Sequence, residues 1–384
     1  MFASVKGIRF DRNELAGAFG DIGTDLPLLI GVILASGIDP ASVLIMFGIM
    51  QVLSGLTYGV PMPVQPLKAF ATLVIAQKIT GDIIFAGGLA IGVIMLVLYS
   101  TRLIGWLSKV TPKAVVRGIQ FGLGIQLASL AIKNYIGSDG STGYILAGIC
   151  FFIGVLLMGN RKFPPALLII FLGVMYSFFV TGFDFVAVGK GFSFHLPKFD
   201  ADVSFADVMT GLVLLALPQL PLSLSNSILA TGRLARDYYP EKKITVQKIS
   251  LTYSIMNIIN PFFGGFPTCH GVGGMAGHYA FGGRTGGSVI IYGSLYLTIG
   301  LFFSNVFTEV IGIFPLPVLG VLLLFEAFML IKLMGDTAHK KEDFIIAVIV
   351  GLIAGYLPYG FLVGLVVGFI LKYLSKNNII GLTK

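Results

Sequence analysis

The chain has 384 residues, of which 56% are hydrophobic and 11% are charged, and its mean hydropathy is +0.92. These values exclude a soluble globular protein and indicate a polytopic helical membrane protein. The net charge of +8 does not indicate nucleic-acid binding, because the basic residues lie in short loops between apolar segments, where membrane topology places them.

Apolar segments long enough to cross or half-cross a bilayer form two sets of seven. The first set lies at about 15–37, 41–58, 63–78, 82–100, 113–132, 143–159 and 164–182. After a polar stretch at about 184–202, the second set lies at about 205–231, 244–259, 268–280, 287–307, 312–333, 343–357 and 359–375. We therefore predict an all-α membrane protein with fourteen transmembrane segments.

The distribution of Lys and Arg predicts the orientation of these segments. With a cytoplasmic N-terminus, 21 of the 26 basic residues fall on the cytoplasmic side. The exceptions are Lys78, Lys133, Lys190 and Lys198 on the outer side and Lys68 within a span. Since no signal peptide is evident, we expect a multi-pass protein of the plasma (inner) membrane with both termini in the cytoplasm.

Because seven is odd, the second set must be inverted relative to the first. Asp25-Leu26-Pro27-Leu28 in the first segment resembles Gln219-Leu220-Pro221-Leu222 in the eighth, which supports an internal repeat. The two predicted repeats cover 13–183 and 204–376.

The third and tenth segments are interrupted. Pro61, Pro63 and Pro66 lack an N–H and disfavour helical angles in the residues before them, so a helix can start only near Pro66. The stretch Gly264–Gly271 breaks the tenth segment in the same way. Irregular backbone within a membrane survives only when it is buried in protein or lines a cavity. We expect two half-helices whose N-termini face each other near the midplane and together supply roughly one positive charge.

Several motifs carry a family resemblance. The segments Gln219–Gly232 and Asn257–Gly287 resemble helices eight to ten of sulfate permease-type anion transporters, and Val115–Ile119 is similar to their fifth helix. A narrower resemblance, to the molybdate transporter branch of that family, is carried by Phe19–Leu28, Pro61–Pro66 and Pro218–Leu222.

The resemblance implies a secondary-active transporter of a tetrahedral oxyanion, with molybdate as the first choice and sulfate or tungstate as alternatives. It implies a core domain, from about 13–100 and 204–307, that moves against a gate domain from about 113–183 and 312–376. Dimers are common in the family. Because the chain ends at Lys384, we expect no cytoplasmic C-terminal domain, and we expect no cofactor and no enzymatic activity.

A reversible carrier should bind a dianion with many neutral donors, such as amides, hydroxyls and N–H groups at helix ends. The candidate substrate-binding residues are Thr24, Gln65, Pro66, Leu67, Lys68, Gln219, Ser223, Asn226, Thr268, Cys269, His270 and Gly271. Gln65 and Gln219 could instead satisfy the backbone freed by the helix breaks. Ser223 and Asn226, three residues apart, are expected on one helical face, with Ser225 pointing elsewhere; they could also simply join helices.

Acidic residues within the membrane are functional candidates by default. Asp21 and Asp25, four residues apart, share a face if that segment is helical. Ionised carboxylates repel a dianion, so we predict a coupling or gating role, with one of them carrying a proton. Capping of the nearby break and pairing with Lys68 are the alternatives. Glu326 is the third coupling or gating candidate, with a polar clamp between helices as its alternative.

Other classes of function fit less well. Cys269, His270 and His278 lie on a glycine-rich stretch without a fourth ligand, so we predict no metal site. A nucleobase carrier of the same fold would need an acidic residue beside each broken helix, and 268–280 contains none. An anion channel stays open as an alternative, which electrical recordings would distinguish. A membrane enzyme would need a clustered nucleophile or metal-ligand set, which the sequence does not show.

Overall fold

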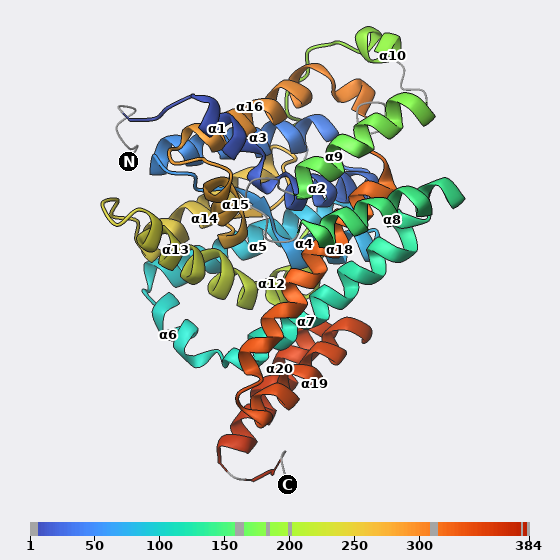
Figure 1. The fold of residues 1–384 in the computed structure, drawn as a ribbon. Coiled ribbons are helices and arrows are strands. Elements are labelled where there is room, and N and C mark those ends of the chain that lie inside the picture. Colours follow the sequence, from blue (N-terminus) through green and yellow to red (C-terminus); the bar gives the residue numbers. More distant parts are fainter. Residues whose placement is uncertain are drawn as a thin grey trace.

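The computed structural model describes residues 7–157, 165–181, 185–198, 202–307, 314–377 and 379–381, which form an almost wholly helical bundle (Figure 1). The helices of the first half are α1 (Arg12–Ala18), α2 (Ile22–Ser36), α3 (Pro40–Tyr58), α4 (Lys68–Gln77), α5 (Gly81–Ser100), α6 (Ile104–Val110), α7 (Lys113–Leu130), α8 (Gly140–Leu156), α9 (Pro165–Tyr176) and α10 (Phe185–Lys190). Those of the second half are α11 (Phe205–Gly211), α12 (Leu217–Leu222), α13 (Thr231–Tyr238), α14 (Val246–Phe262), α15 (Val272–Ala280), α16 (Gly287–Phe302), α18 (Leu316–Lys332), α19 (Lys341–Tyr356) and α20 (Gly360–Lys376).

Shorter irregular pieces interrupt or extend these helices. The 3₁₀ segments are η1 (Phe19–Asp21), η6 (Ser304–Val306) and η7 (Leu333–Thr337), and the π-helical segments are η2 (Ala131–Ile136), η3 (Ser177–Thr181), η4 (Leu212–Ala216) and η5 (Ser223–Ala230).

The helices are those of a membrane protein. Within the described part of the chain, six continuous helices are long and apolar enough to cross a bilayer: 12–36, 40–58, 81–100, 113–136, 205–238 and 316–337. Each of the fourteen predicted segments overlaps a helix of the structure. The prediction of a polytopic helical membrane fold is confirmed.

The third and tenth segments are the short, broken ones, as predicted. Helix α4 has 10 residues and α15 has 9, and each follows a two-residue strand, β1 (Gln65–Pro66) and β2 (Thr268–Cys269). The first half-helix begins at Lys68, two residues later than the expected start at Pro66, because Pro66 belongs to the strand.

The remaining helices pack mainly in pairs. Helix α3 lies along α16 and α5 along α14, whereas α7 lies along α18 and α19. Glycine permits the closest contacts. A Cβ atom added at Gly48 would lie 2.6 Å from the carbonyl oxygen of Gly293, and one at Gly118 would lie 2.7 Å from that of Ala347. Small residues at such contacts let helix backbones approach closely, which favours packing in lipid.

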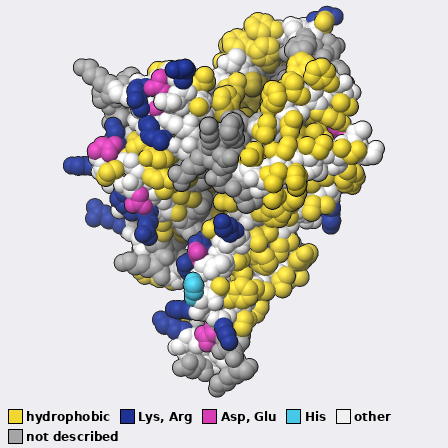
Figure 2. Space-filling view, in the orientation of Figure 1, with side chains coloured by type: hydrophobic (Ala, Val, Ile, Leu, Met, Phe, Trp, Pro, Cys, Tyr) yellow, Lys and Arg dark blue, Asp and Glu magenta, His cyan; other side chains and the backbone are white. Residues whose placement is uncertain are grey.

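Hydrophobic and basic side chains occupy different parts of the surface. Figure 2 shows hydrophobic side chains over the part of the face where Figure 1 places α8 and α9. Exposed apolar side chains on these two helices include Ile145, Phe152 and Phe171. Most Lys and Arg side chains lie along the left and lower part of the same view, around the N-terminus, α13 and the C-terminal end. A broad apolar surface bordered by basic residues is typical of a protein embedded in a bilayer.

A single long helical stretch, 205–238, runs beside the half-helices and changes its geometry on the way. It passes through α11, η4, α12, η5 and α13, with Pro218 and Pro221 inside it. Proline removes a backbone donor, and π-helical turns are frequent at functional sites. This change of geometry decides which side chains of the stretch face the half-helices.

Candidate functional site

The two interrupted segments meet. Strands β1 and β2 pair antiparallel, with Gln65 opposite Cys269 and Pro66 opposite Thr268. The Leu67 N–H extends the pairing by donating to the Pro267 carbonyl oxygen at 3.1 Å. Since a half-helix starts two residues after β1 and three residues after β2, the N-termini of α4 and α15 lie beside each other. The prediction that the two half-helix N-termini meet is confirmed.

Two buried amides hold the crossing strands, and the sequence analysis missed both. From α3, the Gln51 amide donates to the Val64 carbonyl oxygen at 2.8 Å and accepts from the Val64 N–H at 3.1 Å. From α14, the Asn257 amide donates to the Thr268 carbonyl oxygen at 2.7 Å and accepts from the Thr268 N–H at 2.9 Å. These helices are the second segment of each half. In each half, a buried side-chain amide from the second segment therefore bonds both backbone groups of one residue at the strand crossing.

Gln219 caps the first half-helix. Its side-chain oxygen accepts from the Ala69 N–H at 3.0 Å and the Phe70 N–H at 3.2 Å. Its amide nitrogen donates to Ser223 Oγ at 3.2 Å, and this hydroxyl lies 2.7 Å from the Tyr253 hydroxyl. Gln219 thus satisfies the backbone freed by the break, one of the two roles considered for it.

Gln65 joins the first half to the second half-helix. Its amide nitrogen donates to both carboxylate oxygens of Asp21, at 2.6 and 2.7 Å. Its buried side-chain oxygen has no donor in the described part of the protein and lies directly over Gly271, where an added Cβ atom would be 1.4 Å away. Asp21 lies over the first turn of α15, where a Cβ atom at Gly274 would come within 2.1 Å of its Oδ2. A carboxylate of the chain therefore occupies the positive end of the second half-helix.

A buried ion pair links the first half-helix to α18. Lys68 Nζ contacts Glu326 Oε1, and these side chains are only 14% and 13% exposed. The Thr24 hydroxyl donates to the other Glu326 oxygen at 3.3 Å. Of the two roles considered for Glu326, the geometry matches a polar clamp between helices. The alternative pairing of Lys68 with an aspartate is wrong, since no ion pair of Lys68 with Asp21 or Asp25 occurs among the described contacts.

Asp25 lies one helical turn from Asp21 and is also fully buried. Neither of its carboxyl oxygens accepts a hydrogen bond from a described residue. A buried, unpartnered carboxylate is costly, and an ionised Asp21 would add a second negative charge beside it. Of the three carboxyl groups, those of Asp21, Asp25 and Glu326, only that of Glu326 forms an ion pair with Lys68 in the described part of the chain.

The histidine beside β2 serves the strand crossing. His270 Nδ1 lies 2.9 Å from the Pro63 carbonyl oxygen, and Nε2 lies 2.8 Å from the Thr252 hydroxyl. Both ring nitrogens are therefore engaged within the protein. The neighbouring Thr268 hydroxyl accepts from the Asn260 amide at 3.3 Å, and Cys269 is buried. These side chains stabilise the strand crossing.

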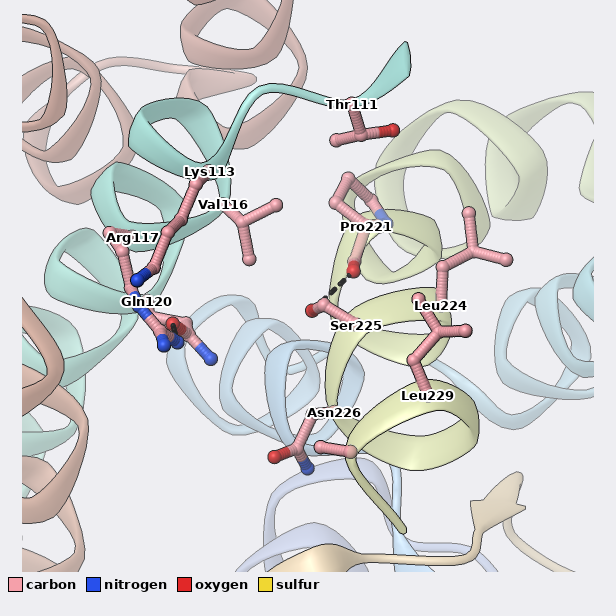
Figure 3. Close-up of a pocket in the computed structure, with 11 residues that line it drawn as sticks. Thr111, Lys113, Val116, Arg117, Gln120, Pro221, Leu224, Ser225, Asn226 and Leu229 are labelled. Carbon is pink, nitrogen blue, oxygen red and sulfur yellow. Dashed lines mark hydrogen bonds between the residues drawn. The ribbon is translucent and has the colours of Figure 1, made fainter. Parts of the chain in front are cut away.

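An open cavity of about 230 Å³ lies next to this network, between α7 and the stretch formed by α12 and η5 (Figure 3). Asn226 and Ser225 line it, whereas Ser223 points into the protein toward Gln219. The expectation that Ser223 and Asn226 share a face, with Ser225 elsewhere, is wrong. Residues 223–230 are π-helical, and their wider turn changes the angle between side chains three residues apart.

Comparison with known proteins identifies the family. A family model described as a molybdate transporter of the MFS superfamily matches residues 13–127 and 211–330, more than half of the chain. Molybdate transporter 2 of Arabidopsis thaliana is 33% identical over 88% of this chain and 82% of its own length. The chain belongs to the molybdate transporter family. Molybdate transporter 1 of the same plant is also 33% identical, over 94% of this chain and 90% of its own length.

Solved structures of anion transporters share the fold of this family member. The transmembrane domain of the cyanobacterial bicarbonate transporter BicA superposes with a TM-score of 0.69 at 17% identity, over 96% of this chain and 98% of that domain. Murine Slc26a9, an anion transporter in the inward-facing state, gives 0.69 at 14% identity over 98% of this chain and 69% of its own. The resemblance to sulfate permease-type transporters is confirmed at the level of the fold.

Proposed function

We propose that this chain is a secondary-active transporter that carries a tetrahedral oxyanion, molybdate, across the membrane. The observation that supports this most is the meeting of the α4 and α15 N-termini at paired strands. Helix N-termini bind anions through their free N–H groups and dipoles. Membership of the molybdate transporter family supports molybdate as the cargo in preference to sulfate.

The substrate would replace contacts that the protein now makes with itself. Lys68 holds Glu326, and the Gln65 amide holds Asp21, so each donor is paired with an acidic side chain. A dianion between the half-helix tips offers Lys68 and Gln65 the same kind of acceptor. In this scheme, binding releases Glu326 from α4 and so frees the half-helix from α18.

The charges at the tips favour cation-coupled transport. Three carboxylates and one ammonium group give a formal charge of −2 if all four groups are ionised, and this would oppose a dianion. Two like unit charges about 4 Å apart repel by about 4 kcal/mol at an effective dielectric constant of 20. We propose that protons on Asp21 or Asp25 remove this repulsion and travel with the substrate.

The proposed movement is that of a core against a gate. The core comprises 13–100 and 204–307, which contain the pairs α3–α16 and α5–α14, and the gate comprises 113–183 and 312–376, which contain α7, α18 and α19. The Lys68–Glu326 pair would cross this boundary. We further propose that both termini are cytoplasmic, that the protein resides in the plasma (inner) membrane, and that it forms a homodimer.

Uptake into proteoliposomes tests the proposal. The purified protein should accumulate labelled molybdate in a saturable manner when a proton gradient is imposed, and tungstate should compete more strongly than phosphate. Sulfate as the better competitor would assign the alternative substrate. Absence of oxyanion uptake under every imposed gradient would refute the proposal, and unitary currents would assign an anion channel instead.

A further inference from the structure

The cavity between α7 and η5 has one basic wall. Lys113, Arg117 and Gln120 project from α7, and Figure 3 shows them together on one side of the cavity. Lys113 Nζ lies 3.4 Å from Asp336 Oδ2, and Arg117 contacts the same carboxylate. Two cations therefore share one anion, which leaves this wall with a formal charge of +1.

The side chain of Arg117 is held in place, but not all of its N–H donors have an acceptor among the described residues. Its Nη1 donates to Gln120 Oε1 at 2.7 Å, and Gln120 is itself buried. Its Nε is buried and donates to no described residue. A guanidinium group presents five N–H donors in a rigid fork that suits oxyanions. The contacts to Gln120 and Asp336 orient this fork at the cavity wall.

The opposite wall supplies neutral polar groups. Asn226 lines this wall, and its amide forms no side-chain hydrogen bond with a described residue (Figure 3). The Ser225 hydroxyl donates to the Pro221 carbonyl oxygen at 2.7 Å, and it can rotate to another acceptor. A water molecule takes about 30 Å³ of the liquid, so about 230 Å³ holds a five-atom oxyanion together with several waters.

We infer that this cavity is a second, transient oxyanion site, bound by Arg117 and Lys113 from α7 and by Asn226 and Ser225 from η5. The inference rests on the proposed function, since the dianion assigned to this cavity is the same one that is proposed to bind at the half-helix tips. Its two walls belong to the proposed gate and the proposed core. Movement of the core therefore takes the site apart, and the site exists in only one of the two states of the transporter.

The inference predicts that substitutions of Arg117 and Asp336 change the KM for molybdate in opposite directions. Replacing Arg117 by Gln removes the oriented fork and should raise the KM for molybdate by about ten-fold, as expected for a charge-assisted hydrogen bond. Asp336→Asn releases both cations and should lower the KM by about three-fold at low salt. Asn226→Ala should raise the KM by a few fold with little change in kcat. A merely structural Arg117–Asp336 pair predicts a loss in both variants.

The measurement is the initial rate of uptake into proteoliposomes as a function of molybdate concentration, at low and high salt. Lys340→Gln is the matched control, because it removes an exposed charge from the nearby turn between α18 and α19. If Arg117→Gln does not fold, Asp336→Asn and Asn226→Ala decide the question alone. A KM for Asp336→Asn that changes in the same direction as that for Asn226→Ala, or KM values unchanged in both variants, would overturn the second site. Molybdate uptake by the wild type would in that case leave the proposed function standing.

Discussion

The N-termini of the two half-helices share the same strand–helix arrangement, but different groups lie against them. The tip of α4 is capped by a neutral amide, that of Gln219, and carries the ammonium group of Lys68. The tip of α15 is covered by a carboxylate, that of Asp21. Each cap comes from the opposite repeat. Under the proposed function, α4 would supply the attraction for an oxyanion, whereas α15 would become available only when the charge on Asp21 is neutralised or moved.

The largest expected effect comes from removing the positive charge of the α4 tip. Lys68→Gln should abolish molybdate uptake, because it deletes the one ammonium group at the tips among the described residues and leaves Glu326 buried and without its ion-pair partner. Lys133→Gln, which removes an exposed charge from η2, should transport normally. The double variant Lys68→Gln with Glu326→Gln should recover the thermal stability but not the uptake. Recovery of uptake in the double variant would make the pair a structural clamp.

A glycine at the α15 tip gives the next effect. Gly271→Ala should fold poorly or lose uptake, because its methyl group would lie 1.4 Å from Gln65 Oε1. Gly273→Ala, two residues further along, has open space around it and should retain wild-type melting temperature and uptake. Melting curves and uptake rates of the two variants check the packing of the crossing. Tolerance of alanine at position 271 would show that Gln65 is not held over α15.

Two substitutions of Gln219 distinguish a loss of stability from an effect of charge at the N-terminus of α4. Gln219→Ala leaves two buried N–H groups without an acceptor and should cost about 1–3 kcal/mol of stability. Gln219→Glu keeps an acceptor and favours the helix N-terminus, so it should fold. Its added negative charge should nevertheless suppress uptake. Normal transport by the Glu variant would mean that the oxyanion does not approach this tip.

The smallest effect concerns Asp21. If a proton on Asp21 or Asp25 accompanies the oxyanion, uptake by the wild type should rise as the external pH is lowered. Asp21→Asn mimics the neutral form and keeps an acceptor for Gln65, so its uptake should depend less on pH. Initial rates over a series of buffers, compared with those of Asp25→Asn, check this. Identical pH profiles for all three proteins would exclude both carboxyl groups from coupling.

The sequence predicted the segments and the breaks well because their causes are local. Proline at 61, 63 and 66 and glycine near 264–271 exclude a continuous helix wherever the rest of the chain lies. The family motifs located the half-helices in the same places. The pairing of their strands then follows from the inverted repeat.

The partners of individual side chains depended on contacts that no local pattern reveals. Lys68 and Glu326 are 258 residues apart in the chain, and Gln219 reaches a helix 150 residues earlier. The π-helical turns at 223–230 changed the face of Asn226, and periodicity analysis assumes a uniform α-helix. Gln51 and Asn257 were overlooked, although amides in the second segment of each repeat were the available signal.

The most direct test is a structure of the protein in lipid with tungstate, whose heavy atom is easily located and whose charge and shape match those of molybdate. The account predicts strong density between the tips of α4 and α15, within hydrogen-bonding distance of Lys68 and Gln65, with Glu326 displaced from Lys68. Density only in the cavity between α7 and η5, or far from both tips, would contradict it.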